Sequence, residues 1–565
     1  MIPDDLRARL AAWLADDPDE RDRAELEALA AGDGSAAEEE ELADRFSGRL
    51  EFGTAGLRGT IGAGPNRMNR AVVRGTTAAL ARWLRGQGRG IAGAGAAEAG
   101  VVIGCDARHR SDEFADEAAR VLAGAGIRVH LLPRRQPTPL LAFAVRHLRA
   151  AAGIMITASH NPPAYNGYKL YLRDGAQIVP PADAEIESEI RSLGPLSAVP
   201  LAPPDSPLIV RHGDEVARAY LDLICAASPA PPDAAWLRFV YTPLHGVAGG
   251  LAMRAFEQAG FTPPDLVAAQ AEPDPEFPSV TFPNPEEPGA LDLALAQARR
   301  SGADLVLAND PDGDRLAVAV PRPDGVWQTL TGDQVGALLG AYRLDVTAAE
   351  PGPGDRLVVT TIVSSTLLSR IAAAAGARYA ETLTGFKWIV RAERPGSRFV
   401  FGYEEALGYA VGEIVRDKDG IGAALALLGL AARARSRGGS LLDACDALET
   451  AHGVHLTGQV TVGTAAPVDV MARLRAAPPA EFCGARVLET TDLTGGTPDL
   501  PSADVLSYQL LGARVVIRPS GTEPKIKAYL EVVEPVIGGR LAGARQAAAD
   551  RFGPLRDAVA ALLAT

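Results

Sequence analysis

Short apolar runs separated by stretches of helical spacing mark the body of this chain. The runs Gly100 to Gly104, Val129 to Leu132 and Ala150 to Ile156 each have the length of a buried strand. Between them, apolar residues recur at the spacing of an amphipathic helix. Strands that alternate with helices predict a largely parallel sheet, so the main body begins with an α/β unit.

The same alternation returns twice more and then gives way to a run of strands. The chain has 565 residues, which is too long for one hydrophobic core. A stretch rich in Pro, Ala and Ser near 195–207 has the composition of a linker. We therefore expect two N-terminal helices over 1–47, followed by domains over 48–205, 206–325, 326–450 and 451–565.

Composition narrows the class of protein. Apolar residues make up 47% and charged residues 22%, as in ordinary globular domains, and the net charge of -14 argues against a nucleic-acid partner. The acidic start is unlike a signal peptide, and no apolar stretch approaches the roughly 18 residues of a membrane span. The four scattered cysteines fit reduced thiols. We expect a cytoplasmic protein that binds a small molecule and neither nucleic acid nor membrane.

Lysine is scarce in this chain, so the position of each lysine is informative about where a functional site lies. The 56 basic residues include only Lys169, Lys387, Lys418, Lys525 and Lys527. Arginine can replace lysine wherever either cation serves, so the remaining lysines mark places where a compact ammonium group matters. All of them lie in or beside the polar loops described next.

A serine loop follows the apolar run that ends at Ile156. It reads Thr157-Ala158-Ser159-His160-Asn161-Pro162, with Lys169 a few residues beyond. Ligands of open α/β sheets bind at the carboxyl ends of strands, and a serine there can accept a phosphoryl group if a base and a cation assist. A plain turn is the alternative, because Ser, Asn and Pro favour turns. Other polar loops of the chain, described below, favour the interpretation of Ser159 as a nucleophile over that of a plain turn.

A glycine-rich segment before the first unit presents one arginine. Gly53, Gly56 and Gly59 surround Arg58, the only basic residue in that predicted turn. The glycines are compatible with a simple hairpin. An arginine presented by such a turn also suits a phosphate group, because its forked N–H groups match phosphate oxygens.

Three alternating carboxylates follow the strand predicted at Ala303 to Ala308. Asp310, Asp312 and Asp314 can converge on one hard cation. An EF-hand loop would need Gly at its sixth and Glu at its twelfth position, where this chain has Arg315 and Pro321. Oxygen-only ligands with room for a phosphate oxygen favour Mg²⁺, and a solvated acidic turn is the remaining alternative.

Two later loops carry groups suited to a phosphorylated sugar. Glu404 and Glu405 can accept hydrogen bonds from vicinal hydroxyls, although one of them can instead pair with Lys387. A second set of donors and backbone amides forms a cradle for a dianion, namely Arg518, Ser520, Gly521 and Thr522. His245 is interpreted as a loop histidine with a structural hydrogen bond.

Taken together, these loops resemble those of the α-D-phosphohexomutases, the superfamily of phosphoglucomutase and phosphomannomutase. The resemblance covers residues 45–565 and rests on four motifs in order, TASHNP, DPDGDR, GYEEALG and RPSGTEPK. It implies a heart-shaped protein of four domains around a central cleft. Three would be related α/β domains with mixed sheets, and the fourth a smaller C-terminal α+β domain.

The resemblance also implies a role for each candidate residue. Ser159 would carry the phosphate, with His160 beside it, and Asp310, Asp312 and Asp314 would hold Mg²⁺ together with the phosphoserine. Lys169 and Arg58 would assist proton transfer and stabilise charge. The remaining residues would bind substrate: Arg315, Lys387, Glu404, Glu405, Arg518, Ser520, Gly521 and Thr522.

The implied reaction moves phosphate between the 1- and 6-hydroxyls of glucose phosphate. It would pass through a phosphoserine and a sugar bisphosphate, with glucose 1,6-bisphosphate as activator, in a monomer or weak homodimer. One departure concerns Ala406, which stands where phosphoglucomutases have a serine, between Tyr403 and Tyr409. The pattern is more similar to phosphopentomutases and long bacterial phosphoglucomutases, so pentose phosphate and mannose phosphate remain alternatives. A phosphatase or a non-catalytic sugar-phosphate binding protein is a more distant alternative.

Overall fold

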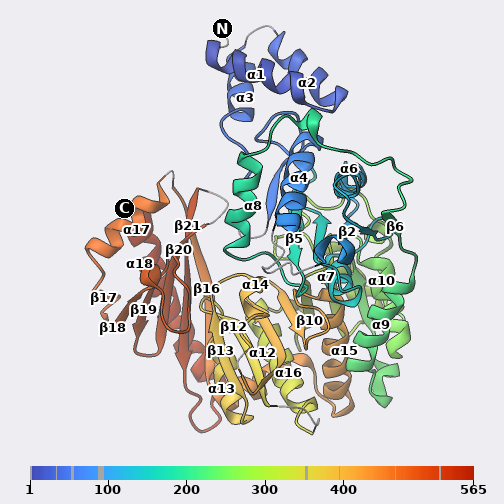
Figure 1. Ribbon diagram of the computed structural model, residues 1–565. Coiled ribbons are helices and arrows are strands. Elements are labelled where there is room, and N and C mark those ends of the chain that lie inside the picture. The colour runs from blue at the N-terminus through green and yellow to red at the C-terminus, as the bar shows by residue number, and fades with distance from the viewer. Residues whose placement is uncertain are drawn as a thin grey trace. The chain divides into compact units, whose positions relative to one another are not determined.

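The computed structural model describes residues 3–32, 35–51, 56–86, 95–349, 354–393, 395–464, 466–520 and 524–564 (Figure 1). These residues form two compact units. The first unit comprises Met1–Ala227, Arg238–Leu316 and Ile414–Ile421. The second unit comprises Ser228–Leu237, Ala317–Glu413 and Gly422–Thr565.

The helices and strands that lie in the first unit are α1 (Asp4–Asp16), α2 (Glu20–Ala30), α3 (Ala36–Arg45), β1 (Leu57–Thr60), α4 (Arg70–Gly86), α5 (Ala96–Ala99), β2 (Val101–Cys105), α6 (Ser111–Gly124), β3 (Val129–Leu131), α7 (Thr138–His147), β4 (Ala152–Ile156), β5 (Tyr165–Leu172), α8 (Ala182–Arg191), β6 (Ile209–Arg211), α9 (Glu215–Ala227), β7 (Phe239–Thr242), α10 (Gly249–Ala259), β8 (Asp265–Leu266), α11 (Asp292–Ser301) and β9 (Leu305–Asn309). Short 3₁₀ turns at Leu196–Ala198 and Ala268–Gln270 complete it.

The sheet that delivers the serine loop is mixed. Its strand order is β1-β5-β4-β2-β3-β6, in which β2 pairs in parallel with β3 and β4, and β5 runs antiparallel to β4 and β1. β6 pairs in parallel with β3, so Ile209–Arg211, which lies within the range 206–325 expected for the next domain, is an edge strand of this sheet. The largely parallel arrangement predicted from the sequence therefore holds for its central strands.

Helices cover both faces of this sheet. Apolar side chains of α4, α6 and α8 form one core with Ile103 and Ile154. On the other face, α7 packs so closely that Gly104 and Gly153 leave little room for a Cβ atom beside Leu141. Burial on both faces explains why β2 and β4 are continuous apolar runs. It also fixes the position of the loop that leaves β4.

Three further strands of the first unit carry the acidic loop. β7 pairs in parallel with both β8 and β9, and β9 ends at Asn309, directly before the three aspartates. Gly313 has a φ of 72°, a left-handed conformation that glycine adopts without strain. This turn lets Asp312 and Asp314 face the same point.

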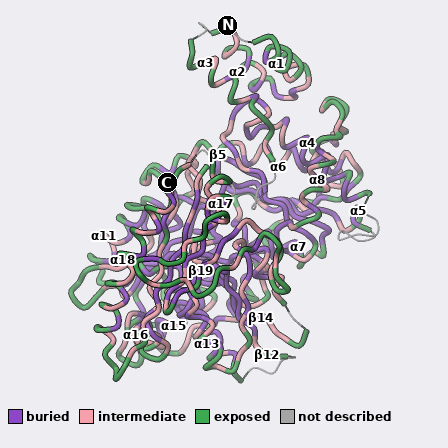
Figure 2. The backbone as a smooth tube through the Cα atoms, turned by 90° about the vertical axis from the view of Figure 1, so that its left-hand side faces the viewer, coloured by how far each residue is buried: buried purple, intermediate pink, exposed green. Residues whose placement is uncertain are grey.

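The N-terminal segment contains three helices where two were expected. α1, α2 and α3 share a small core that includes Leu10, Leu26, Leu42 and Phe46. Most of their remaining residues are exposed or half-buried, which Figure 2 shows as green and pink stretches of the tube. α3 was missed because its run of glutamates leaves only Leu42 buried, too little to show a helical apolar pattern.

The helices and strands that begin beyond the acidic loop are β10 (Leu316–Pro321), β11 (Trp327–Thr329), α12 (Gly332–Val346), β12 (Asp355–Thr361), α13 (Leu367–Ala374), β13 (Arg378–Thr382), α14 (Phe386–Ile389), β14 (Ser397–Glu404), β15 (Gly408–Val411), α15 (Gly420–Ser436), α16 (Leu441–His452), β16 (Val454–Gly463), α17 (Pro467–Ala476), β17 (Glu481–Phe482), β18 (Ala485–Asp492), β19 (Leu506–Leu510), β20 (Ala513–Pro519), β21 (Lys525–Glu534) and α18 (Leu541–Ala564). Short 3₁₀ turns lie at Pro232–Trp236 and Leu493–Gly495.

The second unit contains the antiparallel pair of β10 and β11 and two further sheets of different kinds. The sheet β13-β12-β14-β15 has a parallel centre and one antiparallel edge strand. The sheet β16-β21-β20-β19-β18-β17 is antiparallel in its described pairings. A shared apolar cluster that includes Ile362, Val516 and Tyr529 joins the two sheets. Among the described residues, no helix is long and apolar enough to cross a membrane.

Candidate active site

Ser159 lies in a strained and well-anchored position between β4 and β5. Its φ is 52°, in the left-handed region that non-glycine residues rarely adopt, and its side chain is buried. The Ser159 N–H donates to Oγ1 of Thr157 at 2.9 Å, and the Asn161 N–H donates to the carbonyl of Ala158 at 3.1 Å. The loop is thus a fixed turn that presents one hydroxyl.

Two possible proton acceptors flank that hydroxyl. Ser159 Oγ donates to Oδ2 of Asp310 at 3.1 Å, and Nδ1 of His160 lies at the same distance of 3.1 Å. Burial lowers the pKa of His160 well below its ordinary value, and the positive charges of Arg315 and Arg58 lower it further. A neutral imidazole at this place can accept a proton.

The three aspartates after β9 converge as the sequence predicted. Their carboxylate oxygens lie within 4.8 Å of one another, and all three side chains are fully buried. Within the described part of the chain, Oδ1 of Asp312 and Oδ1 of Asp314 have no hydrogen-bond partner. Buried acceptors are rarely left this way, and free carboxylate oxygens facing one point suit a hard divalent cation. The residues therefore fit a metal ion.

Two lysines balance this negative charge. Nζ of Lys169 lies 2.7 Å from Asp312 and 3.1 Å from Asp314, and Nζ of Lys418 lies 3.3 Å from Asp314. Burial alone would raise the pKa of Asp312 and Asp314, but the ammonium groups outweigh it and lower both. Burial raises the pKa of Asp310, and its two acidic neighbours raise it further.

Lys418 reaches this site from a distant segment of the sequence. Ile414–Ile421 follows β15 in the chain yet belongs to the first unit. Oδ2 of Asp417 accepts hydrogen bonds from the Tyr171 hydroxyl at 2.7 Å and from the Gln177 amide at 2.8 Å, which anchors the segment. Sequence reasoning did not place Lys418 in the site, although the scarcity of lysine was a usable signal.

Two predicted arginines also lie at this centre. Arg58 is on strand β1, where a turn was expected, and its Nη1 donates to Oδ1 of Asn161 at 2.9 Å. The backbone N–H of Arg315 donates to Oδ1 of Asp310 at 3.0 Å. The Arg315 guanidinium lies 3.9 Å from Oδ2 of Asp310. Both arginines therefore add positive charge beside the serine loop. Residues 52–55, which complete the predicted glycine turn, lie outside the described residues.

Arg108 is a residue that the sequence reasoning missed. Its guanidinium donates to the backbone carbonyls of the serine loop at distances from 2.5 to 3.2 Å, namely those of Ser159, Asn161, Pro162 and Tyr165. Asp106 lies 3.4 Å from its Nε, and the guanidinium stacks over the ring of Phe277. One buried arginine therefore holds the whole loop by its backbone.

The predicted sugar-binding residues lie in the second unit. Glu404 ends β14, and Glu405 follows it in the turn to β15. Oε2 of Glu405 accepts hydrogen bonds from Ser364 at 3.0 Å and Thr361 at 3.3 Å. Burial raises the pKa of Glu405 to about 7, with a further contribution from the charge of Glu404. Lys387 is buried on α14, with its ammonium over the ring of Trp388.

The tyrosines around Ala406 have a structural role. Tyr403 and Tyr409 are fully buried; the Tyr403 hydroxyl donates to Asp333 at 3.0 Å and the Tyr409 hydroxyl to the carbonyl of Gly332 at 3.4 Å. They support the turn from inside the fold. His245 forms a 2.8 Å hydrogen bond with Ser279, as a structural loop histidine would.

The predicted phosphate cradle is described in part. Arg518 lies near the end of β20, and its Nη2 donates to the hydroxyl of Tyr529 at 3.0 Å. The backbone N–H of Ser520 donates to the carbonyl of Lys525 at 2.8 Å. Gly521 and Thr522 lie outside the described residues. Arg518 and Ser520 thus frame the start of this loop.

Comparison with known proteins identifies the family. Four family models match in order: phosphoglucomutase/phosphomannomutase α/β/α domain I at residues 49–195, domain II at 218–325, domain III at 331–450 and the C-terminal domain at 460–545. The chain belongs to the phosphoglucomutase/phosphomannomutase family. The predicted architecture of three α/β domains and a C-terminal domain is confirmed, and the protein is an enzyme, a phosphosugar mutase of the isomerase class.

Similar proteins carry different substrate names. A Haemophilus influenzae protein named "Probable phosphomannomutase" is 41% identical, over 82% of this chain and 93% of its own length. A Staphylococcus epidermidis phosphoglucomutase is 36% identical over 87% and 92%. A Mus musculus phosphopentomutase is 35% identical over 93% and 90%. A family crystal structure from Burkholderia thailandensis, 24% identical, covers 89% of this chain and 97% of its own with a TM-score of 0.66.

Proposed function

We propose that this mutase moves phosphate between the 1- and 6-hydroxyls of glucose phosphate, with Ser159 as the residue that carries the phosphoryl group. One observation supports this most strongly. The Ser159 hydroxyl lies 3.1 Å from Asp310, within a group of three buried aspartates in which two carboxylate oxygens have no partner among the described residues. A nucleophile beside a cation site is what phosphoryl transfer requires.

In the proposed cycle, the sugar hydroxyl attacks the phosphorus of phosphoserine. The new bond joins phosphorus to the sugar oxygen, and the bond between phosphorus and Ser159 Oγ breaks. The proton of the sugar hydroxyl passes to Nδ1 of His160, which lies 3.1 Å from Ser159 Oγ and returns the proton to that oxygen as its bond to phosphorus breaks. The ammonium of Lys169, paired with Asp312 and Asp314, supplies positive charge. Mg²⁺ held by Asp310, Asp312 and Asp314, when bound, neutralises negative charge on the transferring group. The positive charges of Arg58, Arg315 and Lys418 serve the same end.

The product of that first transfer is a sugar bisphosphate. Its other phosphate then returns to Ser159, so the substrate must be held by the phosphate that is not reacting. We assign this task to Arg518, Ser520, Gly521 and Thr522, because a guanidinium and backbone amides match a dianion. Glu404, Glu405 and Lys387 would bind the sugar itself. A trace of glucose 1,6-bisphosphate would restore any enzyme that has lost its phosphate.

Glucose phosphate is the preferred substrate in this proposal, and pentose phosphate is the second candidate. Similarity to the Staphylococcus epidermidis phosphoglucomutase supports the first, and similarity to the Mus musculus phosphopentomutase supports the second. Ala406 also favours a changed sugar site, because it lacks a hydroxyl where phosphoglucomutases have one. Mannose phosphate is a third candidate, supported by the Haemophilus influenzae relative.

The test is ³¹P NMR of the purified protein with Mg²⁺ and a trace of glucose 1,6-bisphosphate. Glucose 1-phosphate, ribose 1-phosphate and mannose 1-phosphate are offered in separate tubes. Fast migration of phosphate on glucose supports the proposal. Faster migration on ribose or mannose would show that the phosphate of that sugar, and not glucose phosphate, is the preferred substrate. Release of free phosphate in every tube, without migration, would overturn it.

A further inference from the structure

The loop between β2 and α6 has two arginines that point to different parts of the first unit. Arg108 and Arg110 are separated by one residue, His109. Arg108 donates to the backbone of the serine loop, as described above. Arg110 instead contacts the N-terminal helices, which no part of the proposed function uses. One short loop therefore connects these helices to the nucleophile.

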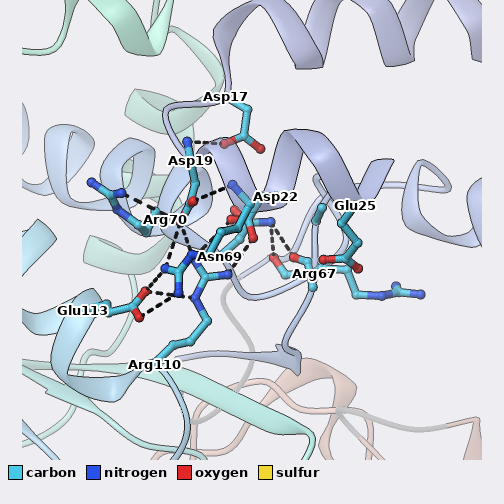
Figure 3. Close-up of polar contacts among 12 residues, drawn as sticks. Asp17, Asp19, Asp22, Glu25, Arg67, Asn69, Arg70, Arg110 and Glu113 are labelled. Carbon is cyan, nitrogen blue, oxygen red and sulfur yellow. Dashed lines mark hydrogen bonds and ion pairs between the residues drawn. The ribbon is translucent and has the colours of Figure 1, made fainter. Parts of the chain in front are cut away.

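Arg110 is held by two buried aspartates at the start of α2. Its Nη2 donates to Asp19 at 2.5 Å and its Nη1 to Asp22 at 2.6 Å (Figure 3). Arg110 has a φ of 62°, so these contacts hold a residue in the left-handed region. The Arg110 Nε also donates to Glu113 at 3.2 Å, and Arg21 of α2 donates to the same carboxylate. The α2 helix thus reaches α6 through a network of ion pairs.

Hydrogen bonds also join the loop itself to the strand after Ser159. The Asn166 amide donates to the carbonyl of His109 and to Oγ of Ser111, both at 2.9 Å. Ser111 Oγ donates to Asp106 at 2.6 Å, and the Arg108 N–H donates to the same carboxylate at 2.9 Å. A displacement of Arg110 would therefore be transmitted to Arg108 and to residues 157–166.

We propose that the N-terminal helices position the nucleophile, with Asp19, Asp22 and Arg110 as positioning residues that act through Arg108. This inference rests on the proposed role of Ser159. The ion pairs of Arg110 with Asp19 and Asp22 are largely buried, so removing one partner unbalances the charge of this network and shifts the loop. Misplacement of a reacting group by about 1 Å can cost about 10²-fold in rate.

The experiment compares Arg110→Gln, Arg110→Lys and Asp22→Asn with the wild type. We expect Arg110→Gln and Asp22→Asn to lower kcat about 10-fold with KM nearly unchanged, because the groups that bind sugar are not touched. Arg110→Lys keeps the positive charge between the aspartates and should recover part of the rate. Amide hydrogen exchange of residues 157–165 should become faster in Arg110→Gln and in Asp22→Asn. This measurement does not depend on which sugar phosphate is the substrate.

Arg134→Gln is the matched control. Arg134 is also held by two aspartates of α6, Asp112 at 2.8 Å and Asp116 at 2.7 Å, but it is half-exposed and forms no ion pair with the described residues of the N-terminal helices. It should keep the wild-type kcat and the wild-type exchange. An equal loss in Arg134→Gln, or wild-type kcat and exchange in folded Arg110→Gln and Asp22→Asn, would overturn the inference. If Arg110→Gln does not fold, the kcat and the hydrogen exchange of Asp22→Asn and Arg110→Lys test the inference instead.

Failure of the proposed function would look different. The wild-type protein would then move phosphate on none of the three sugars, while exchange of residues 157–165 would still respond to Arg110→Gln. If the wild type is active but substitution of Arg110 changes neither kcat nor the exchange of the serine loop, only the positioning role is rejected.

Discussion

The carboxyl groups of Asp312 and Asp314, in the first unit of this mutase, and of Glu405, in the second, have pKa values shifted in opposite directions. In the first unit, the ammonium groups of Lys169 and Lys418 overcome burial and lower the pKa of Asp312 and Asp314. In the second unit, burial and the charge of Glu404 raise the pKa of Glu405 to about 7. The same chemical group is thus held ionised in one place and close to protonation in the other.

This contrast in pKa matches the two tasks that we propose for these carboxyl groups, which are cation binding for phosphoryl transfer and recognition of the sugar. Ionised carboxylates with free oxygens suit a cation, which phosphoryl transfer needs whatever the sugar. A carboxyl group near its pKa can accept or donate a hydrogen bond and so suits a sugar hydroxyl. Changes in the first unit should therefore abolish transfer for every substrate, whereas changes in the second unit should alter binding.

Ser159→Ala is the largest expected effect. Removal of the hydroxyl that we propose to carry the phosphate should lower turnover at least about 10⁴-fold on glucose, ribose and mannose phosphates alike. The fold should be kept, because one small loop side chain contributes little to stability. Turnover by ³¹P NMR and circular dichroism check both points, with Ser192→Ala, an exposed serine, as control. Transfer by a folded Ser159→Ala at near the wild-type rate would contradict the assignment.

Asp312→Asn should come next, with a loss of roughly 10³-fold. An amide is a poorer ligand than a carboxylate for a hard cation, and Lys169 loses its nearest partner. Calorimetric titration should give weaker Mg²⁺ binding, and a chelator should remove wild-type activity that Mg²⁺ restores. Asp324→Asn, which affects an exposed pair with Arg322 and a hydrogen bond from the Val326 N–H, is the control. Unchanged Mg²⁺ affinity in Asp312→Asn would reject the proposed metal site.

Arg518→Gln tests the recognition side of the comparison. It should raise KM about 10- to 100-fold with a smaller change in kcat, because a charge-assisted bond to the waiting phosphate is lost. Arg518→Lys should restore only part of the binding, since an ammonium lacks the forked geometry of the guanidinium. Steady-state kinetics give both constants. If kcat falls while KM stays constant, Arg518 belongs to the chemistry instead.

Glu405→Gln should have the smallest effect, and it depends on pH. A carboxyl group with a raised pKa contributes stability below its unfolded pKa and loses it as the pH rises through about 7. The wild type should therefore lose stability between pH 5 and 8 relative to Glu405→Gln, by at most about 3 kcal/mol. Thermal unfolding of both proteins across this range measures the difference. Parallel curves would mean that Glu405 is ionised throughout.

The sequence predicted β2, β3, β4, β7 and β9 of the first unit and the convergence of its aspartates, but it did not predict β1, β5, β6 or β8. β4 ends at Ile156, as the apolar run indicated, because that strand is buried on both faces. The aspartates follow one buried strand at alternating positions, and a local turn at Gly313 brings them together. Each of these features depends on neighbours in sequence, which is why it could be inferred from pattern alone.

Contacts between distant segments could not be inferred in the same way. Lys418 reaches Asp314 because tertiary packing brings Ile414–Ile421 into the first unit. Arg108 resembled an ordinary loop arginine until its carbonyl partners were seen. The acidic helix α3 was not predicted from the sequence because its buried surface is small.

The sequence by itself determined the family, the order of the domains and the residue types available for phosphoryl transfer. The tertiary structure decided which carboxylates have a lowered pKa, which arginine holds the serine loop and which ion pairs connect the N-terminal helices to the neighbouring loop. The physical reason is that apolar patterning reports burial along a single element. Electrostatic partners are chosen across the fold by distances of a few ångströms, which no spacing along the chain records.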